Sequence, residues 1–199
     1  MRRATVRRTT RETDVTVSLS LDGGGTASVK TGVPFLDHML TLTAVHGRLN
    51  LSVRATGDLE IDVHHTSEDV GIVIGEALLA ALGDRKGINR FGWAYVPMEE
   101  ALARVVLDIS GRAKLVIRDQ RKPRTKLMGS GTDYQWGDLE HWLESFTRAA
   151  KVTLHIDVLA GADFHHTAEG VFKALGRALA QAVSKDKRMR GIPSTKGQL

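Results

Sequence analysis

The sequence contains no cysteine among its 199 residues. Disulfide bonds, thiolate metal sites, iron–sulfur clusters and cysteine nucleophiles are therefore excluded, so any metal chemistry must rely on histidines and carboxylates. Long apolar runs are missing too, because the longest, residues 70–83, is too short for a bilayer span and contains Glu76. The N-terminus opens with arginines and has no apolar signal core. We expect a cytoplasmic protein that does not associate with membranes.

Aromatic residues are also few, with five Phe, three Trp and two Tyr. None lies in a basic patch of the kind that stacks on bases, so the composition argues against binding of nucleic acid. Lysine and arginine exceed aspartate and glutamate by 28 to 23, and the excess is concentrated towards the two ends of the chain. This charge suits a phosphate or another acidic partner, although basic termini are often only solvated.

The apolar pattern predicts the same order of elements twice. In the first half, it predicts strands at 15–21 and 26–31 joined as a hairpin, a helix at 34–47, a strand at 49–55 and a helix at 67–82. In the second half, it predicts strands at 101–109, 113–117 and 152–159 and helices at 138–150 and 167–183. The polar segment 119–137 is expected to form an extended loop.

Two pairs of motifs support an internal duplication. The sequence HHTSE at 64–68 returns as HHTAE at 165–169, and DHML at 37–40 returns as EHWL at 140–143. Two independent motifs at nearly the same offset indicate a repeated unit. We therefore predict an α/β (α+β) fold made of a duplicated strand-strand-helix-strand-helix unit. It is expected to form one domain over 1–199, with repeats at about 10–92 and 93–185 and a C-terminal tail at 186–199.

Six of the eight histidines fall in these repeated motifs, accompanied by two glutamates. They are His38, His64, His65, His141, His165 and His166, with Glu68 and Glu169. Adjacent histidines at the start of a helix point in different directions, so one ion is not expected to bind both members of a pair. The simplest arrangement has two ions, each drawing one histidine from each HHxxE motif, with His38 and His141 completing the sets. Each glutamate follows its pair closely enough to approach one imidazole.

Imidazole and carboxylate ligands suit Mn, Fe, Co, Ni or Zn and suit Ca or Mg poorly. The positive end of a helix dipole also disfavours a charged imidazolium, which favours neutral histidines that can coordinate. The alternative is that paired histidines only cap helices or pack in the core. One such motif is weak evidence, whereas two copies with a repeated flanking histidine favour metal binding.

For two arginines and the C-terminal tail, the sequence pattern allows either a phosphate-binding role or no specific role. Arg90 and Arg112 lie beside glycines, where a guanidinium binds either a phosphate or a surface carboxylate. The tail GIPSTKG at 191–197 offers a hydroxyl and a lysine to a phosphate, or is merely flexible. None of the three is decisive alone.

Two further histidines and two glutamates also stay open. His46, near the end of the first predicted helix, is either a C-cap cation or a substrate contact, and we include it among the substrate contacts. His155, in the middle of a predicted strand, is expected to be structural or exposed. Glu99 and Glu100 are either catalytic carboxylates or a solvated entrance to a strand.

The motifs FLDHML, HHTSEDVGI, GINRFG, PMEEAL, DISGR, HHTAE and PSTKG extend over almost the whole chain. Together they resemble the imidazoleglycerol-phosphate dehydratase family. The resemblance implies a lyase of L-histidine biosynthesis that converts D-erythro-imidazole-glycerol phosphate into imidazole-acetol phosphate, with two Mn²⁺ ions per active site. Two ions on the ring nitrogens of the substrate would stabilise an imidazolate intermediate, whose electrons expel the adjacent hydroxyl. The segment between Lys122 and Gly137 matches none of these motifs.

The resemblance also implies residue roles. Glu12, in RETD, is the acid/base group and contacts the substrate. The metal ligands are His38, His64, His65, Glu68, His141, His165, His166 and Glu169, and the other matched substrate contacts are Arg90, Arg112, Lys173, Ser194 and Lys196. Two groupings stay open, namely His38 with His64, Glu68 and His166, or His38 with His65, His165 and Glu169. The native metal stays open as well.

The family fold is related to domain 2 of ribosomal protein S5 and assembles into a shell of 24 subunits, with the metals between neighbouring chains. By this resemblance we expect a homo-oligomer whose monomer is inactive. Two other classes of function remain. One is a di-metal phosphoester hydrolase, which would release phosphate. The other is a non-catalytic module, either a metal-storing shell or an RNA-binding relative of the S5-like fold, and RNA binding would fall steeply with salt.

Overall fold

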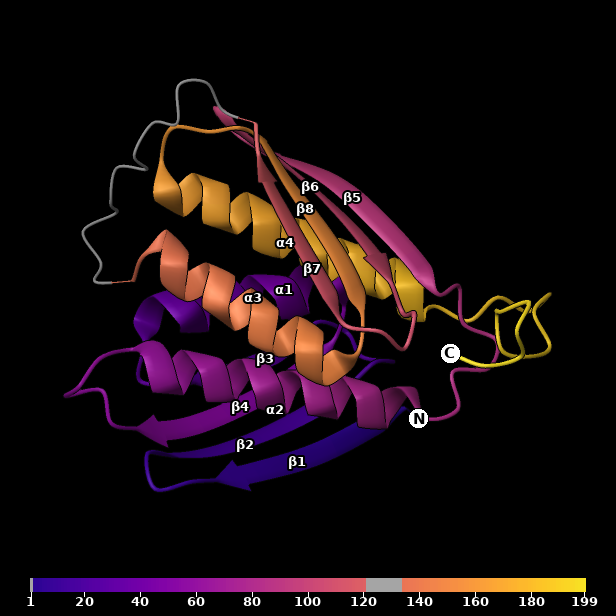
Figure 1. The fold of residues 1–199 in the computed structure, drawn as a ribbon, viewed down its shortest axis with the longest axis horizontal. Coiled ribbons are helices and arrows are strands. Elements are labelled where there is room, and N and C mark those ends of the chain that lie inside the picture. Colours follow the sequence, from indigo (N-terminus) through magenta and orange to yellow (C-terminus); the bar gives the residue numbers. More distant parts are fainter. Residues whose placement is uncertain (1, 121–133) are drawn as a thin grey trace.

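Two four-stranded sheets enclose the helices in the computed structural model, which describes residues 2–120 and 134–199 (Figure 1). Helix α2 packs on strands β1 and β2 of the first sheet, and α4 packs on β5 and β6 of the second. The two helix layers meet where α2 contacts α3 and α1 contacts α4. The described part of the chain is therefore layered as sheet, helices, helices, sheet.

The two halves have the same topology. The first half consists of β1 (Arg3–Thr9), β2 (Thr13–Ser20), β3 (Ala27–Lys30), α1 (Pro34–Gly47), β4 (Asn50–Gly57) and α2 (His64–Leu82). The second consists of β5 (Phe91–Met98), β6 (Ala101–Asp108), β7 (Lys114–Asp119), α3 (Trp136–Ala150), β8 (Thr153–Ala160) and α4 (Phe164–Val183). The sheet orders are β1-β2-β4-β3 and β5-β6-β8-β7, and only the last pair in each sheet is parallel. The predicted duplication and the α/β class are confirmed.

Each half has one strand more than the apolar pattern predicted. The sequence of β1, RATVRRT, carries three arginines, and only every second residue is partly buried. The sequence of β5 contains Gly92 and Pro97, which are unusual in strands. The predicted hairpin of 15–21 with 26–31 is wrong, because β2 pairs with β1 and β4, and β3 lies parallel to β4 on its other side.

The other predicted elements match the structure to within a few residues. The predicted loop 119–137 lies largely in residues 121–133, which are outside the described residues. Its described ends differ from the prediction, since β7 extends to Asp119 and α3 begins at Trp136. Among the described residues, no helix combines the length and the apolar character needed to cross a membrane.

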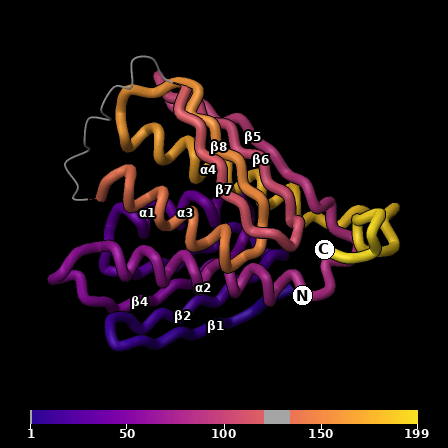
Figure 2. Tube along the Cα trace, viewed as in Figure 1, coloured from indigo at the N-terminus to yellow at the C-terminus, as the bar shows by residue number. Residues whose placement is uncertain are grey.

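Glycines allow the helix layers to approach closely. A Cβ atom at Gly75 of α2 would lie 2.7 Å from the carbonyl oxygen of Phe146 in α3, and one at Gly176 of α4 would lie 2.5 Å from that of Thr43 in α1. No side chain fits at either point, so α2 packs directly on α3 and α1 directly on α4. Helices from different halves are thereby held together. Figure 2 shows that the N-terminal ends of α2 and α4 lie at the same end of the molecule, away from the two chain termini.

Candidate metal centres and phosphate site

The first turns of α2 and α4 carry the two histidine pairs. Asp62 accepts a hydrogen bond from the backbone N–H of His64 at 2.8 Å, and Asp163 accepts one from that of His166 at 2.9 Å. These carboxylates satisfy amides that the helix itself leaves free, which explains why both helices begin three residues earlier than the apolar spacing indicated. The first histidine of each pair and the glutamate four residues later therefore share one helix face.

His38 of α1 meets His165 and Glu169 of α4 in what we call the α1/α4 cluster. The Nε2 atoms of His38 and His165 lie 2.8 and 3.0 Å from Glu169 Oε1, and Lys173 Nζ lies 2.5 Å from Oε2. Burial raises the pKa of Glu169, but hydrogen bonds from Lys173 and the two histidines outweigh it and lower the pKa to about 2. The carboxylate is therefore ionised at neutral pH, as a metal ligand must be.

His64 and Glu68 of α2 meet His141 of α3 in the corresponding α2/α3 cluster. The rings of His64 and His141 stack with centroids 4.1 Å apart, and His141 Nε2 lies 3.5 Å from Glu68 Oε2. His141 Nε2 is buried and has no hydrogen-bond partner within residues 2–120 and 134–199. Buried polar atoms without a partner are rare, and a cation held between this nitrogen and the carboxylate would satisfy both. The donor set therefore fits a metal ion.

Each cluster joins the two halves of the chain. The flanking histidine of the first half, His38, meets the HHxxE motif of the second half, and His141 meets the motif of the first. The prediction that each ion takes a histidine from both HHxxE motifs is not met within one chain, because each cluster uses a single motif. Of the two groupings that stayed open, the chain brings His38 to His165 and Glu169, and does not bring it to His64 and Glu68.

His65 and His166 lie outside both clusters and face other carboxylates, and Glu99 and Glu100 lie close enough to His166 to form a third group of possible metal ligands. His65 Nδ1 is 2.9 Å from Asp58 Oδ2, and His166 Nδ1 is 2.9 Å from Glu100 Oε2. These hydrogen bonds raise the pKa of both histidines above the usual range, mainly through Asp58 and Glu100. The helix-dipole argument, which favoured neutral imidazoles, is therefore outweighed at these two positions by a directly bonded carboxylate.

Glu12 lies in the turn between β1 and β2, where its carboxylate comes within 3.9 Å of His65 Nδ1 and remains 56% exposed. The hydroxyl of Thr10 accepts hydrogen bonds from the backbone N–H groups of Glu12 and Thr13 at 3.1 and 3.0 Å. The hydroxyl of Thr13 donates in turn to the buried carboxylate of Asp69, which follows Glu68 in α2. The turn that carries Glu12 is thus tied to the helix that carries a metal-cluster glutamate.

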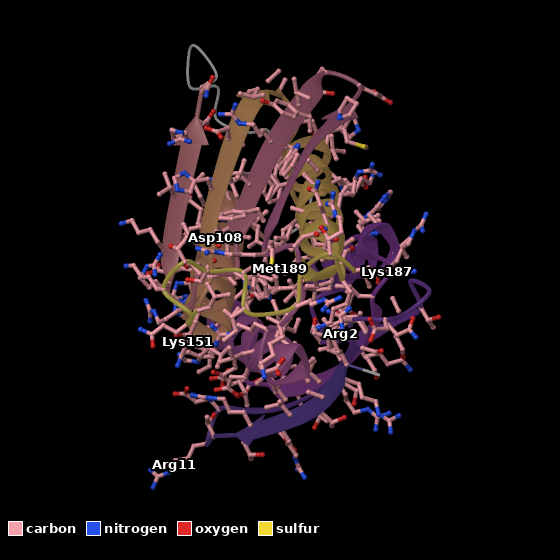
Figure 3. The ribbon with its side chains drawn as sticks, turned by 90° about the vertical axis from the view of Figure 1, so that its right-hand side faces the viewer. Arg2, Arg11, Asp108, Lys151, Lys187 and Met189 are labelled. Atoms are coloured by element: carbon pink, nitrogen blue, oxygen red, sulfur yellow. The ribbon has the colours of Figure 1, made fainter. Side chains whose placement is uncertain are left out.

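The predicted phosphate contacts Arg90, Arg112, Ser194 and Lys196 gather elsewhere, where the C-terminal segment folds back. Arg90 donates to both oxygens of Asp108 at 2.7 and 3.0 Å and to the carbonyl of Pro193 at 2.9 Å. Leu199 passes so close to Gly111 that no side chain fits there. Figure 3 looks onto this end of the molecule, with Asp108 beside the C-terminal segment. The structure therefore brings the tail next to the two arginine-bearing segments.

The four predicted phosphate contacts and the α1/α4 cluster lie at opposite ends of α4. The backbone N–H of Arg90 donates to the carbonyl of Ala182 in the last turn of this helix, whereas His165 lies in its first turn. At about 1.5 Å per residue, this part of the helix is roughly 25 Å long. A single small substrate cannot contact both groups within one chain.

Lys173 and His46 lie near the α1/α4 cluster. Lys173 bonds Glu169, and its Nζ is also 2.9 Å from Met98 Sδ. Burial lowers the pKa of His46, and the charges of Lys173 and Arg177 lower it further, so this histidine is neutral at pH 7. His155 is half-buried on β8 and lies outside both clusters.

Comparisons with known proteins connect this geometry to one family. The family model described as imidazoleglycerol-phosphate dehydratase matches residues 31–179. The chain belongs to the imidazoleglycerol-phosphate dehydratase (IGPD) family. The dehydratase of Laribacter hongkongensis is 54% identical over 200 residues, covering 100% of this chain and 99% of its own, and that of Methanocella arvoryzae is 52% identical with full coverage of both. The crystal structure of Pyrococcus furiosus IGPD in complex with (S)-C348 is 36% identical and covers 98% and 100% of the two chains, with a TM-score of 0.81.

The contacts of some polar residues in this IGPD fold could not be predicted from the sequence. Asp58 and Asp69 belong to no recognised ligand pattern, and only the fold shows that they contact His65 and Thr13. Glu100 had two interpretations, and its bond to His166 shows that it is not simply a solvated charge. Asp58 and Glu100 lie in turns that follow strands, and Asp69 lies in the second turn of α2. At these positions, spacing carries little information about tertiary contacts.

Proposed function

We propose that this chain removes water from imidazole-glycerol phosphate to give imidazole-acetol phosphate, using two metal ions held by the α1/α4 and α2/α3 clusters. Membership of the IGPD family makes the chain a lyase of histidine biosynthesis. The observation that carries the two-ion proposal is the pair of equivalent clusters, each with two imidazoles and one carboxylate from both halves of the chain. Their oxygen and nitrogen donors suit Mn²⁺, which we propose as the native ion.

Each cluster offers three ligands, and the remaining histidines of the two pairs are proposed to complete the sets. His38, His165 and Glu169 would hold one ion, and His64, Glu68 and His141 the other. His65 and His166 cannot join the cluster formed by their own neighbours, because adjacent positions on a helix face different ways. We propose that they serve ions held by another copy of the chain. When bound, the two ions would act as Lewis acids on the imidazole of the substrate and help its ring accept electron density.

Glu12 is the proposed acid/base residue. Dehydration of this substrate requires removal of a carbon-bound proton and, for the ketone, delivery of a proton to the neighbouring carbon. The carboxylate of Glu12 is exposed and makes no hydrogen bond among the described residues, so it is available to a bound substrate. The hydrogen bonds of Thr10 and Thr13 hold its turn in place, which limits the positions that the carboxylate can reach.

The phosphate contacts are proposed to reach this site from a neighbouring chain. Arg90, Arg112, Ser194 and Lys196 lie about one helix length, roughly 25 Å, from the α1/α4 cluster, which is too far for one small substrate to bridge. Lys173 and His46, near the α1/α4 cluster, are the proposed contacts within the same chain. A closed oligomer that places one end of α4 against the other end of a neighbouring α4 would complete every site. We propose a homo-oligomer, with 24 subunits as the family resemblance implies.

The experiment that tests this function follows product formation from imidazole-glycerol phosphate while metal is removed and returned. Purified protein is stripped with a chelator, reloaded with Mn²⁺ and analysed for metal content in the same sample. We expect activity to disappear on chelation and to return at about two ions per chain. Full activity of the stripped protein, or two bound ions with no turnover, would contradict the proposal.

A further inference from the structure

Two carboxylates have no part in the functions proposed above, yet each contacts a histidine of an HHxxE motif. Asp58 Oδ2 lies 2.9 Å from His65 Nδ1, and Glu100 Oε2 lies 2.9 Å from His166 Nδ1. A carboxylate on Nδ1 fixes the tautomer and the direction of the ring, and it leaves Nε2 on the far side free to ligate. The two histidines outside the clusters are thus held in the same manner.

The two halves reach this arrangement with residues from different places. Asp58 directly follows β4, and the corresponding residue after β8 is Gly161, which has no side chain to offer. Glu100 lies in the turn between β5 and β6, and the corresponding turn between β1 and β2 carries Glu12. The second half therefore uses its turn carboxylate to hold the histidine, whereas the first half uses a residue from another loop.

Because of this difference, Glu100 and Glu12 make different hydrogen bonds. Glu100 bonds His166 and also accepts hydrogen bonds from the backbone N–H groups of Ala162 and Asp163 at 3.4 and 3.1 Å. Glu12 remains 3.9 Å from His65 Nδ1, beyond hydrogen-bond distance, because Asp58 already occupies that nitrogen. Of these two equivalent turns, one carries a carboxylate that is hydrogen-bonded, and the other carries a carboxylate that makes no hydrogen bond in the described part of the chain.

We infer that Asp58 and Glu100 are positioning residues that hold His65 and His166 with Nε2 turned towards the metal, and that Asp58 does so in place of Glu12. Glu12 is thereby released for proton transfer. The inference rests on the proposed function for the role of Glu12 and for the ligand role of the two histidines. Its first part, the orientation of the histidines, is measurable with Mn²⁺ alone.

The metal arm of the test uses Glu100→Gln. The glutamine oxygen can still accept the two backbone N–H groups, so the loop is retained, but its amide N–H₂ cannot accept a hydrogen bond from Nδ1. We expect one of the two ions to bind about 10–100-fold more weakly in equilibrium dialysis against Mn²⁺. Glu60→Gln is the matched control, because Glu60 is an exposed carboxylate with no bonded partner among the described residues. Unchanged Mn²⁺ affinity in a folded Glu100→Gln protein would overturn the inference.

The catalytic arm uses Asp58→Ala. Glu12 is then the nearest remaining carboxylate to His65 Nδ1 and is expected to close onto it, so that kcat at saturating Mn²⁺ falls while KM changes little. Asp58→Asn keeps a side-chain oxygen for Nδ1 and is expected to restore most of the loss. Combining Asp58→Ala with Glu12→Gln removes both carboxylates and should weaken one ion as Glu100→Gln does. A wild-type kcat in Asp58→Ala, or no recovery in Asp58→Asn, would overturn the exchange of roles.

The two arms also separate this inference from the proposed function. If the reloaded wild-type protein binds two ions but produces no imidazole-acetol phosphate, the proposed function fails while the Mn²⁺ affinity of Glu100→Gln still tests the positioning role. Thermal unfolding of each variant in chelator reports folding without metal. A loss of Mn²⁺ affinity together with an unchanged melting temperature supports positioning, whereas equal losses in the Glu60→Gln control would contradict it.

Discussion

His38 Nε2 lies 2.8 Å from Glu169 Oε1, although 131 residues separate the two in the sequence. The contact exists because α1 and α4 pack directly on each other, which places the flanking histidine of one half beside the glutamate of the other. His141 and Glu68 form the converse contact between α3 and α2. An ion in either cluster would therefore link the two halves, and binding would stabilise the folded chain by mass action.

Glu169→Gln is expected to remove one ion and leave the other. The substitution replaces the ionised ligand of the α1/α4 cluster and does not touch His64, Glu68 or His141. Metal analysis after reloading should give about one Mn²⁺ per chain instead of about two. Glu76→Gln, an exposed change on α2 away from both clusters, is the control. Two ions in Glu169→Gln would show that this cluster is not a metal site.

Glu12→Gln should separate binding from turnover. The amide has nearly the same shape as the carboxylate and makes no contact on which the turn depends, since Thr10 bonds only the backbone of residue 12. Metal content and substrate affinity are therefore expected to stay near wild type, while kcat falls by about 10²–10⁴-fold. Single-turnover assays with metal analysis check both. Near-normal kcat would remove Glu12 from the mechanism.

Much of the fold and the members of the two histidine–glutamate clusters were accessible from the sequence, because repeated motifs report on a repeated structure. The HHxxE motifs and their flanking histidines contributed every member of the two clusters. The sequence did not show which flanking histidine meets which HHxxE motif, because this depends on which helices cross. The crossings are set by glycines such as Gly75 and Gly176. Strand β1 was missed because Arg8 occupies its partly buried face, where the alternation requires an apolar residue.

Gly92→Ala is expected to destabilise the chain through the packing of β5 on α4. A Cβ at Gly92 would lie 1.9 Å from the carbonyl oxygen of Ala178, so strand and helix must separate. A loss of about 1–3 kcal/mol in unfolding free energy follows from such overpacking. A Cβ at Gly137, at the start of α3, meets nothing within 4 Å among the residues that the structure describes, so Gly137→Ala should be neutral or stabilising by up to about 1 kcal/mol. Urea unfolding measures the unfolding free energy of both variants. Equal losses in the two would refute the close approach of β5 to α4.

Asp157 gives the second sheet a stability that depends on pH. Burial raises its pKa, but hydrogen bonds from Arg118 and Arg104 at 2.7 and 3.0 Å outweigh it, so the folded-state pKa lies below the ordinary value of 3.8. A lowered pKa stabilises the folded chain above pH 3.8, and the contribution fades as the pH falls further. Asp157→Asn should therefore cost about 1–3 kcal/mol at pH 7 and progressively less towards pH 3. A cost independent of pH would refute the ionic contribution.

Two inactive variants should restore activity when they are combined in one oligomer. Glu12→Gln removes the proposed base at one end of the folded molecule. Arg90→Ala removes a proposed phosphate contact at the opposite end. If each site takes its base from one chain and its phosphate contacts from a neighbour, a mixed oligomer contains some sites in which both groups are intact. Random assembly of equal amounts should give up to about a quarter of wild-type activity.

The mixing must pass through separated subunits, so both variants are stripped of metal, dissociated, combined and reassembled with Mn²⁺. Each variant reassembled alone is the control and should stay inactive. Combining Glu12→Gln with the double variant Glu12→Gln/Arg90→Ala is the matched negative pair, because no chain in that mixture supplies an intact Glu12. Activity in the first mixture alone supports sites shared between chains. If the first mixture stays as inactive as its components after confirmed reassembly, base and phosphate contacts must act within one chain, and the roughly 25 Å along α4 would then exclude Arg90 from the site.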